Sequence, residues 1–160
     1  VNPTIILGAS NWNQSSSAIF KRYASGFSFY STGANGFVDV RDVVDALLKI
    51  SDQRINQERF ILVGENLTFR DLANKLTLAF GQAAPSKKAS LWLTNLLWRF
   101  EKVRGFFFNI EPLITRETAK SARSTKFFSN KKALEKLGMQ FRPIDKSIEV
   151  FAAFYKKTNV

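Results

Sequence analysis

Neither cysteine nor histidine occurs among the 160 residues of the chain, which narrows the chemistry open to its side chains. A zinc site built from thiolates or imidazoles, a Ser-His-Asp triad and a histidine general base are therefore excluded for these residues. Catalysis by this chain would have to use carboxylates, lysine, tyrosine or serine. Without cysteine there are also no disulfides, and a cytoplasmic setting is the default expectation.

Two carboxylates, Asp39 and Asp42, lie where the sequence pattern changes from that of a strand to that of a helix. Residues 37–40 indicate a short strand behind a predicted Asn-Gly turn at 35–36, and the apolar residues of 43–50 recur at helical spacing. Either carboxylate can accept the unpaired amide hydrogens of the first helical turn and face the positive end of the helix dipole. We therefore predict that these acids cap the helix rather than act directly in catalysis.

The elements that must position these groups include two almost continuously apolar segments, residues 3–8 and 59–64. Such segments are typical of strands buried on both faces, as in a parallel sheet covered by helices. A helix lies between them in the sequence, which predicts a βαβ-like arrangement. The fold class is therefore α/β, with part of a parallel sheet and a mostly helical region from about residue 90.

Capping signals and apolar spacing predict the remaining helices. Ser17 can cap a helix over residues 18–24, and Thr68 caps a helix that Gly81 stops. Later in the chain, helices are expected over 90–103, from 115, over 130–137 and from 143 onward.

A basic, Pro-containing linker at residues 82–89 is the predicted internal boundary. It divides the chain into residues 1–81 and a mostly helical region over 82–160. The sequence contains no internal repeat and no low-complexity segment.

The net charge of +11 is distributed unevenly. Residues 1–80 carry eight Lys and Arg against seven Asp and Glu, a balance of +1, whereas residues 81–160 carry sixteen against six, a balance of +10. In one interpretation these basic side chains rim a pocket for a phosphate-bearing or otherwise anionic substrate, because guanidinium groups bind such anions bidentately. In another they bind nucleic acid; no nucleic-acid motif accompanies them, so a solvated basic face is favoured over this second interpretation. The residues of the pocket interpretation are Lys87, Lys88, Arg99, Lys102 and Arg104.

Two motifs resemble those of a known enzyme family. Residues 36–43, Gly-Phe-Val-Asp-Val-Arg-Asp-Val, resemble the "G-x-x-F-V-x-V-x-D-hydrophobic" signature of extended short-chain dehydrogenase/reductases, which include nicotinamide-dependent epimerases, dehydratases and dihydroflavonol-reductase-like enzymes. Residues 2–8, Asn-Pro-Thr-Ile-Ile-Leu-Gly, are similar to the Asn-Pro-Thr strand that follows the catalytic helix of that family. The resemblance covers the whole chain but only the second half of the family fold. It implies that residues 1–81 are the second half of a Rossmann-like dinucleotide-binding domain and that 82–160 bind substrate.

The resemblance also implies site residues. The start of the first strand would touch the nicotinamide of NAD or NADP through backbone groups, and a serine of the following loop would approach the cofactor. The implied cofactor-binding residues are Pro3, Thr4, Ile6, Ser16 and Ser17. The implied substrate-binding residues are Trp12, Arg99 and Arg104.

Two catalytic signatures of that family do not occur in these residues. The sequence has no Gly-rich G-x-x-G-x-x-G turn, and no lysine lies four residues after Tyr23, Tyr30 or Tyr155. The resemblance therefore implies the substrate-binding half of a nicotinamide-dependent reductase, dehydrogenase or epimerase acting on a small carbonyl, hydroxyl or sugar-like substrate. We expect this chain alone not to transfer hydride. The competing class is a non-enzymatic basic module that binds nucleic acid or an anionic ligand.

Three expectations concern the chain as a molecule in solution. It begins at Val1 and enters a strand at once, which indicates a fragment of a longer protein. A parallel sheet cut in half leaves an unpaired strand edge, so we expect self-association through that edge. The longest apolar run, residues 91–98, is far short of the roughly 20 residues that span a bilayer, so no membrane partner is expected.

Overall fold

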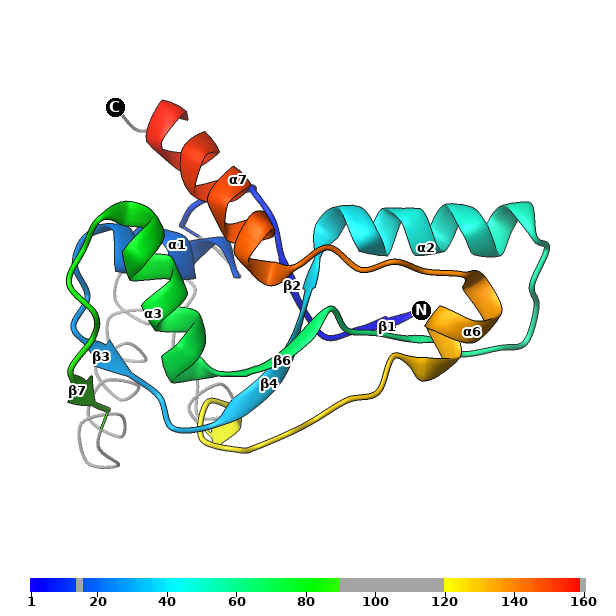
Figure 1. Ribbon diagram of the computed structural model, residues 1–160, viewed down its shortest axis with the longest axis horizontal. Coiled ribbons are helices and arrows are strands. Elements are labelled where there is room, and N and C mark those ends of the chain that lie inside the picture. The colour runs from blue at the N-terminus through cyan, green and yellow to red at the C-terminus, as the bar shows by residue number, and fades with distance from the viewer. Residues whose placement is uncertain (14–15, 90–119, 159–160) are drawn as a thin grey trace, which may run out of the picture.

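The computed structural model describes residues 1–13, 16–89 and 120–158 of the chain, and they form an α/β fold (Figure 1). This confirms the predicted fold class. The elements in chain order are β1 (Asn2–Pro3), β2 (Ile5–Leu7), α1 (Ser17–Ala24), β3 (Phe29–Tyr30), β4 (Ala34–Asp39), α2 (Val40–Asp52), β5 (Ile61–Leu62), β6 (Glu65–Thr68), α3 (Phe69–Phe80), β7 (Lys87–Lys88), α6 (Lys131–Leu137) and α7 (Ile144–Thr158).

The two apolar segments do pair as parallel strands. β1 pairs in parallel with β5, and the Thr4 amide extends this pairing by donating to the Leu62 carbonyl at 3.0 Å. β4 then pairs in parallel with β2 and antiparallel with β6, while the Gly64 amide donates to the Phe37 carbonyl at 2.8 Å. The strand β4 therefore joins the segment that holds β1 and β2 to the segment that holds β5 and β6.

The predicted turn at 35–36 is wrong, because Asn35 and Gly36 lie inside β4. A Cβ atom at Gly36 would lie 2.7 Å from Cγ2 of Thr4 and 2.8 Å from Cγ2 of Val63. Glycine at this position therefore allows the close approach of two neighbouring strands, and it does not turn the chain.

Most of the predicted helix ends are confirmed. Asp39 is the N-cap of α2 and accepts the Arg41 amide at 2.8 Å, and the Thr68 hydroxyl accepts the amide of Asp71 at 3.0 Å at the start of α3. Gly81 ends α3 in the left-handed conformation, as glycine C-caps commonly do. The predicted cap at Ser17 is wrong: this residue is the first of α1, and the N-cap before it makes no side-chain capping bond.

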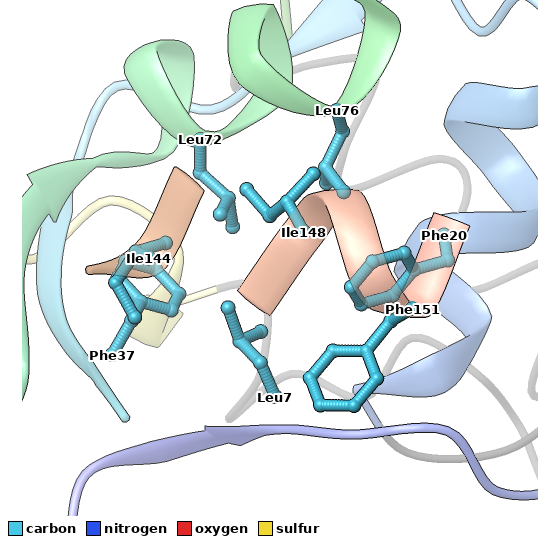
Figure 2. Packing of buried hydrophobic residues seen from close by; sticks show 8 residues of the cluster. All are labelled: Leu7, Phe20, Phe37, Leu72, Leu76, Ile144, Ile148 and Phe151. Atoms are coloured by element: carbon cyan, nitrogen blue, oxygen red, sulfur yellow. The ribbon is translucent and has the colours of Figure 1, made fainter. Parts of the chain in front are cut away.

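The strand β4 is covered on both faces, whereas the two apolar segments predicted to be buried on both faces are only partly buried: Ile61 is exposed, and Ile5 and Ile6 are half-buried. Successive residues of β4 point to opposite faces, so Phe37 enters one core and Val38 the other. The first core gathers α1, α3 and α7 around the sheet, and Figure 2 shows leucines of α3 pointing toward Ile148 of α7. Its buried residues are Leu7, Phe20, Phe37, Leu72, Leu76, Ile144, Ile148 and Phe151. The second core lies under α2 and α6 and holds Val38, Val43, Ala46, Phe60, Leu62, Ala133, Leu137 and Met139.

The two C-terminal helices contribute to both cores. α7 packs on α3, α1 and β4, and α6 packs on α2 and β5. Within the predicted linker, β7 pairs in parallel with β3. The predicted helices over 90–103 and from 115 fall mostly outside the described residues, and the division at residue 81 stays a prediction. No helix in the described ranges is long and apolar enough to cross a membrane.

Candidate functional site

The carboxyl end of β2 brings together three of the residues implied to approach a cofactor. The Ser16 hydroxyl donates to the Ile6 carbonyl at 2.5 Å, and the Ser17 hydroxyl donates to the Gly8 carbonyl at 3.0 Å. Both serines therefore fasten the start of α1 to the end of β2. Open α/β sheets bind ligands outside the carboxyl ends of their strands, so this edge is the candidate cofactor face.

Pro3 and Thr4 lie just before β2 in the chain, and both take part in pairing with β5. Pro3 is in register with Leu62 of β5, and the Thr4 hydroxyl donates to the carbonyl of the same residue at 3.0 Å. The Thr4 side chain is therefore engaged in strand pairing. Backbone contact between these residues and a nicotinamide stays a prediction.

Trp12 is a packing residue of the loop that follows β2. Its ring lies 5.0 Å from the ring of Tyr155 and 6.2 Å from those of Phe20 and Phe154, between centroids. These contacts anchor the loop against α1 and α7. A contact between Trp12 and substrate stays a prediction, and the other two implied substrate residues, Arg99 and Arg104, lie outside the described residues.

The buried carboxylate of Asp39 forms an ion pair with the partly exposed Arg41 at this edge. Its Oδ2 lies 2.6 Å from Nη2 of Arg41, and its Oδ1 accepts from Nε of the same arginine at 2.9 Å. Burial alone would raise the pKa of Asp39, but hydrogen bonds from Arg41 and Ser147 outweigh it and hold that pKa below its ordinary value. The carboxylate thus stays ionised, as a cap and ion-pair partner does. This supports the structural interpretation over a role as a general acid.

Asp42 binds Arg142, a long-range contact that the sequence did not reveal. This fully buried carboxylate accepts the Arg142 amide at 3.0 Å and also pairs with the guanidinium, whose Nη1 lies 2.8 Å from Oδ2 of Asp45. Burial raises the pKa of Asp42 by more than the Arg142 hydrogen bonds lower it. Asp42 therefore fastens α2 to the segment before α7, and the capping role falls to Asp39 alone. The partners are 100 residues apart, so no local pattern signals the pair.

A second candidate region surrounds Arg123. Its Nη2 atom is buried without a hydrogen-bond partner, a condition that no other buried side-chain nitrogen or oxygen shares among the described residues. The turn that carries it is held against the start of β4, because the amides of Gly33 and Ala34 donate at 3.1 Å to the carbonyls of Ala122 and Ser124. Burying a guanidinium nitrogen without a partner is costly, so an acceptor that reached this atom would be stabilising; the Arg123 residue as a whole is half-buried.

Further cations lie near this turn. The Phe69 amide at the start of α3 donates to the Gly33 carbonyl at 3.0 Å, which places the positive end of that helix beside the turn. In the first turn of α3, the Arg70 guanidinium lies 5.0 Å from the ring centroid of Tyr30. Lys87 and Lys88 are exposed on β7, which pairs with β3. The pocket interpretation had singled out both lysines but not Arg123, because an unpartnered buried atom leaves no trace in residue spacing.

These two regions contain no candidate metal centre. No group of three carboxylates that could hold a metal ion occurs in the part of the chain that the structure describes. With parallel strands and helices on both sides of β4, the class that the fold defines is the Rossmann-type α/β fold, and the carboxyl edge of its strands is the candidate ligand face.

Comparison with known proteins places the chain more closely within this class. No protein-family model and no curated protein matches it. Among solved structures, that of gox2253 is 26% identical, with a TM-score of 0.74 over 99% of this chain and 48% of its own. A nucleoside-diphosphate-sugar epimerase from Pseudomonas aeruginosa, PA4631, is 21% identical, with a TM-score of 0.73 over 98% of this chain and 47% of its own. MoeE5, solved in complex with UDP-glucose and NAD, is 13% identical, with a TM-score of 0.63 over 99% of this chain and 46% of its own.

The resemblance predicted from the two motifs is thus confirmed at the level of fold. The chain has the fold of part of an epimerase-like short-chain dehydrogenase/reductase, and it spans about half the length of the solved chains that it matches.

Proposed function

We propose that this chain is the substrate-binding half of an NAD- or NADP-dependent epimerase or reductase that acts on a nucleotide-linked sugar. Three similarities support the proposal. The fold matches about half of PA4631, a nucleoside-diphosphate-sugar epimerase. It also matches about half of MoeE5, which holds UDP-glucose and NAD. The two motifs that resemble the extended family lie at β1 to β2 and at β4 to α2.

The observation that carries the choice of substrate is the unpartnered guanidinium nitrogen of Arg123. A buried donor that lacks an acceptor costs about 1–3 kcal/mol, and a bound anion would remove this cost. Guanidinium groups match phosphate oxygens bidentately. The diphosphate of a sugar nucleotide supplies such oxygens, and the neighbouring Arg70 and α3 dipole would add to the attraction.

At the other end of β4, the chain would form one wall of the cofactor site. The bonds from Ser16 and Ser17 to β2 hold the loop after this strand in place, and its backbone would face the nicotinamide end. When bound, NAD(P) accepts and returns a hydride. The residues described here would bind and orient substrate beside it, while the phosphate-binding turn and the Tyr-x-x-x-Lys proton-transfer pair would come from the other half of the enzyme.

Substrate binding tests this proposal. In the longest natural chain that contains these residues, Arg123→Leu should weaken UDP-glucose binding about tenfold or more, since a hydrogen bond to a charged group contributes roughly 1.5–3 kcal/mol. Arg59→Leu, which removes an exposed arginine before β5, is the matched control and should leave the affinity unchanged. Isothermal titration calorimetry gives both values, and NADH fluorescence reports cofactor binding. A natural chain that binds neither nicotinamide dinucleotide would overturn the proposed enzyme class.

The competing class, a basic module for nucleic acid, gains little support from the aromatic side chains. Stacking on bases needs exposed rings, and Phe20, Phe37, Phe60 and Phe151 are buried in the two cores. Phe27, Phe127 and Phe154 are exposed, but no nucleic-acid motif accompanies them. The basic side chains of β7 are exposed but form a strand of only two residues. The anionic-ligand interpretation of the charge is therefore preferred.

A further inference from the structure

The loop that follows β2 has few backbone contacts of its own. The Ser16 and Ser17 hydroxyls bond to the end of β2 only where the loop enters α1. Residues 9–13 form no backbone–backbone hydrogen bond with another described residue. The Asn13 amide donates to the side chain of Asn11 at 3.0 Å, which is a bond within the loop. Side chains must therefore hold the middle of the loop against the protein.

Trp12 is the side chain that makes this contact. The rings of Trp12 and Tyr155 lie edge to face, with their centroids 5.0 Å apart and their planes at 84°. Phe20 of α1 and Phe154 of α7 each lie 6.2 Å from the Trp12 ring, between centroids. Tyr155 in turn lies 5.5 Å from the ring of Phe80 in α3, at 77°. Edge-to-face pairs have a preferred geometry, so Tyr155 favours one orientation of the Trp12 ring and of the loop that carries it.

Both ends of α7 are fastened, so this helix is a fixed support for the loop. Near its start, the Ile144 amide donates to Oε1 of Glu65 at 2.9 Å, and the buried Ser147 hydroxyl bonds to Asp39 at the end of β4. Near its end, the Lys156 ammonium donates to a carbonyl of the last turn of α3 at 2.9 Å. Figure 1 shows α7 beside the segment that leaves β2. The helix therefore joins the carboxyl edge of β4 to the loop after β2.

We propose that Tyr155 is a positioning residue for the cofactor: through Trp12 it holds the loop after β2 where the loop backbone forms a wall of the nicotinamide site. The inference rests on the proposed function and deepens it, because the two serines fix only one end of this loop. No proton or hydride passes through Tyr155, and its effect on the cofactor is transmitted by the Trp12 ring. Cofactor affinity should therefore depend on a side chain of the C-terminal helix.

Cofactor binding in the longest natural chain that contains these residues tests the inference. Tyr155→Leu should weaken NADH or NADPH binding, followed by cofactor fluorescence, about threefold to tenfold, the factor that an edge-to-face aromatic pair contributes. Tyr155→Phe keeps the ring and should bind the cofactor as the original chain does. The affinity for UDP, which would occupy only the Arg123 end of the site, should change by less than about twofold in both variants, because distant sites act independently. Leu137→Ala opens a cavity in the second core and is the control for a general loss of stability, so it should leave both affinities unchanged.

A double-mutant cycle checks that the effect passes through Trp12. In a chain that carries Trp12→Leu, the contact is already lost, so adding Tyr155→Leu should weaken cofactor binding little further. Phe154→Leu changes a half-exposed ring of the same cluster and serves if Tyr155→Leu does not fold. It should also weaken cofactor binding by more than UDP binding.

Three results would overturn the inference. The first is a cofactor affinity that Tyr155→Leu leaves unchanged. The second is an equal loss of cofactor and UDP affinity in Tyr155→Leu or Phe154→Leu, which would indicate a purely structural role. The third is an additive loss in the cycle with Trp12→Leu. A natural chain that binds no nicotinamide dinucleotide refutes the proposed function, whereas one that binds it equally well with and without Tyr155→Leu refutes only the positioning role.

Discussion

Replacing Asp39 by asparagine should destabilise the chain and remove part of its acid sensitivity. The carboxylate is fully buried, caps α2, and forms two side-chain bonds with Arg41, at 2.6 and 2.9 Å. Asparagine keeps the size of the side chain and an oxygen that can still accept the Arg41 amide. It removes the negative charge that binds the Arg41 guanidinium. The substitution therefore removes the ion pair and keeps the helix cap.

The expected size follows from the exposure of the two partners. A hydrogen bond to a charged group contributes about 1.5–3 kcal/mol. The Arg41 side chain is 41% exposed, so water can replace part of what it loses. We therefore expect Asp39→Asn to lower the free energy of unfolding by about 1.5–2 kcal/mol at pH 7, the lower part of that range. Asp39→Ala also removes the cap, which adds about 1 kcal/mol.

The pH dependence has a defined sign. The bonds from Arg41 and Ser147 overcome the effect of burial and hold the folded-state pKa of Asp39 below its ordinary value. The stabilisation is then fully present above the unfolded-state pKa of about 3.9 and is lost as the pH falls through the folded-state value. The difference in stability between the original chain and Asp39→Asn should therefore shrink below about pH 4.

Urea unfolding followed by circular dichroism from pH 7 down to pH 3 measures both effects. Asp45→Asn is the matched control, because this carboxylate is 44% exposed and also pairs with an arginine at the edge of α2. A partly exposed pair of this kind contributes about 0–1 kcal/mol. Equal losses for Asp39→Asn and Asp45→Asn, or a difference between Asp39→Asn and the original chain that does not change with pH, would refute the reasoning.

Three further predictions concern stability, each read from urea unfolding. Arg142→Met leaves the buried Asp42 carboxylate without its charged partner, so it should lower the free energy of unfolding by about 3 kcal/mol at pH 7. The loss should be smaller at pH 5, because burial already raises the pKa of Asp42 and the carboxylate can then protonate. An equal loss at both pH values would contradict this. Thr68→Ala should cost about 1 kcal/mol through loss of the α3 cap, and Thr68→Ser should cost less than half of that. Gly33→Ala should lower the free energy of unfolding by more than Gly36→Ala. A Cβ atom at Gly33 would meet backbone carbonyls, whereas one at Gly36 would meet side chains that can move. The reverse order would refute this steric account.

The features that the sequence predicted correctly depend on residues close together in the chain. The caps at Asp39 and Thr68 and the left-handed glycine at Gly81 each join residues within four positions. The parallel strands follow from the continuous apolar composition of the two segments, although their burial is only partial. In each case the local pattern determines the structure because few other arrangements satisfy the same backbone groups.

The features that the sequence did not reveal depend on distant partners. Asn35-Gly36 has the composition of a turn, but antiparallel pairing with Leu67 and Asn66 of β6 draws it into a strand. The strand β6 was not predicted, because its alternating burial arises only where it meets β4. The same holds for Arg142, whose partner lies 100 residues away, and for the unpartnered nitrogen of Arg123. Tertiary pairing overrides local propensity at all of these positions.

The strand β4 relates the two candidate regions to each other, and this relation bears on the proposed substrate. Its last residue, Asp39, lies at the carboxyl edge beside the end of β2, and its first, Ala34, is bound to the turn of Arg123. Six residues of strand separate the two ends by roughly 17–20 Å. A small free carbonyl compound cannot contact both regions at once. A substrate that bridges both regions must therefore be an extended molecule, such as the proposed nucleotide-linked sugar, and it must pass beside β4, most of whose residues are buried between the two cores.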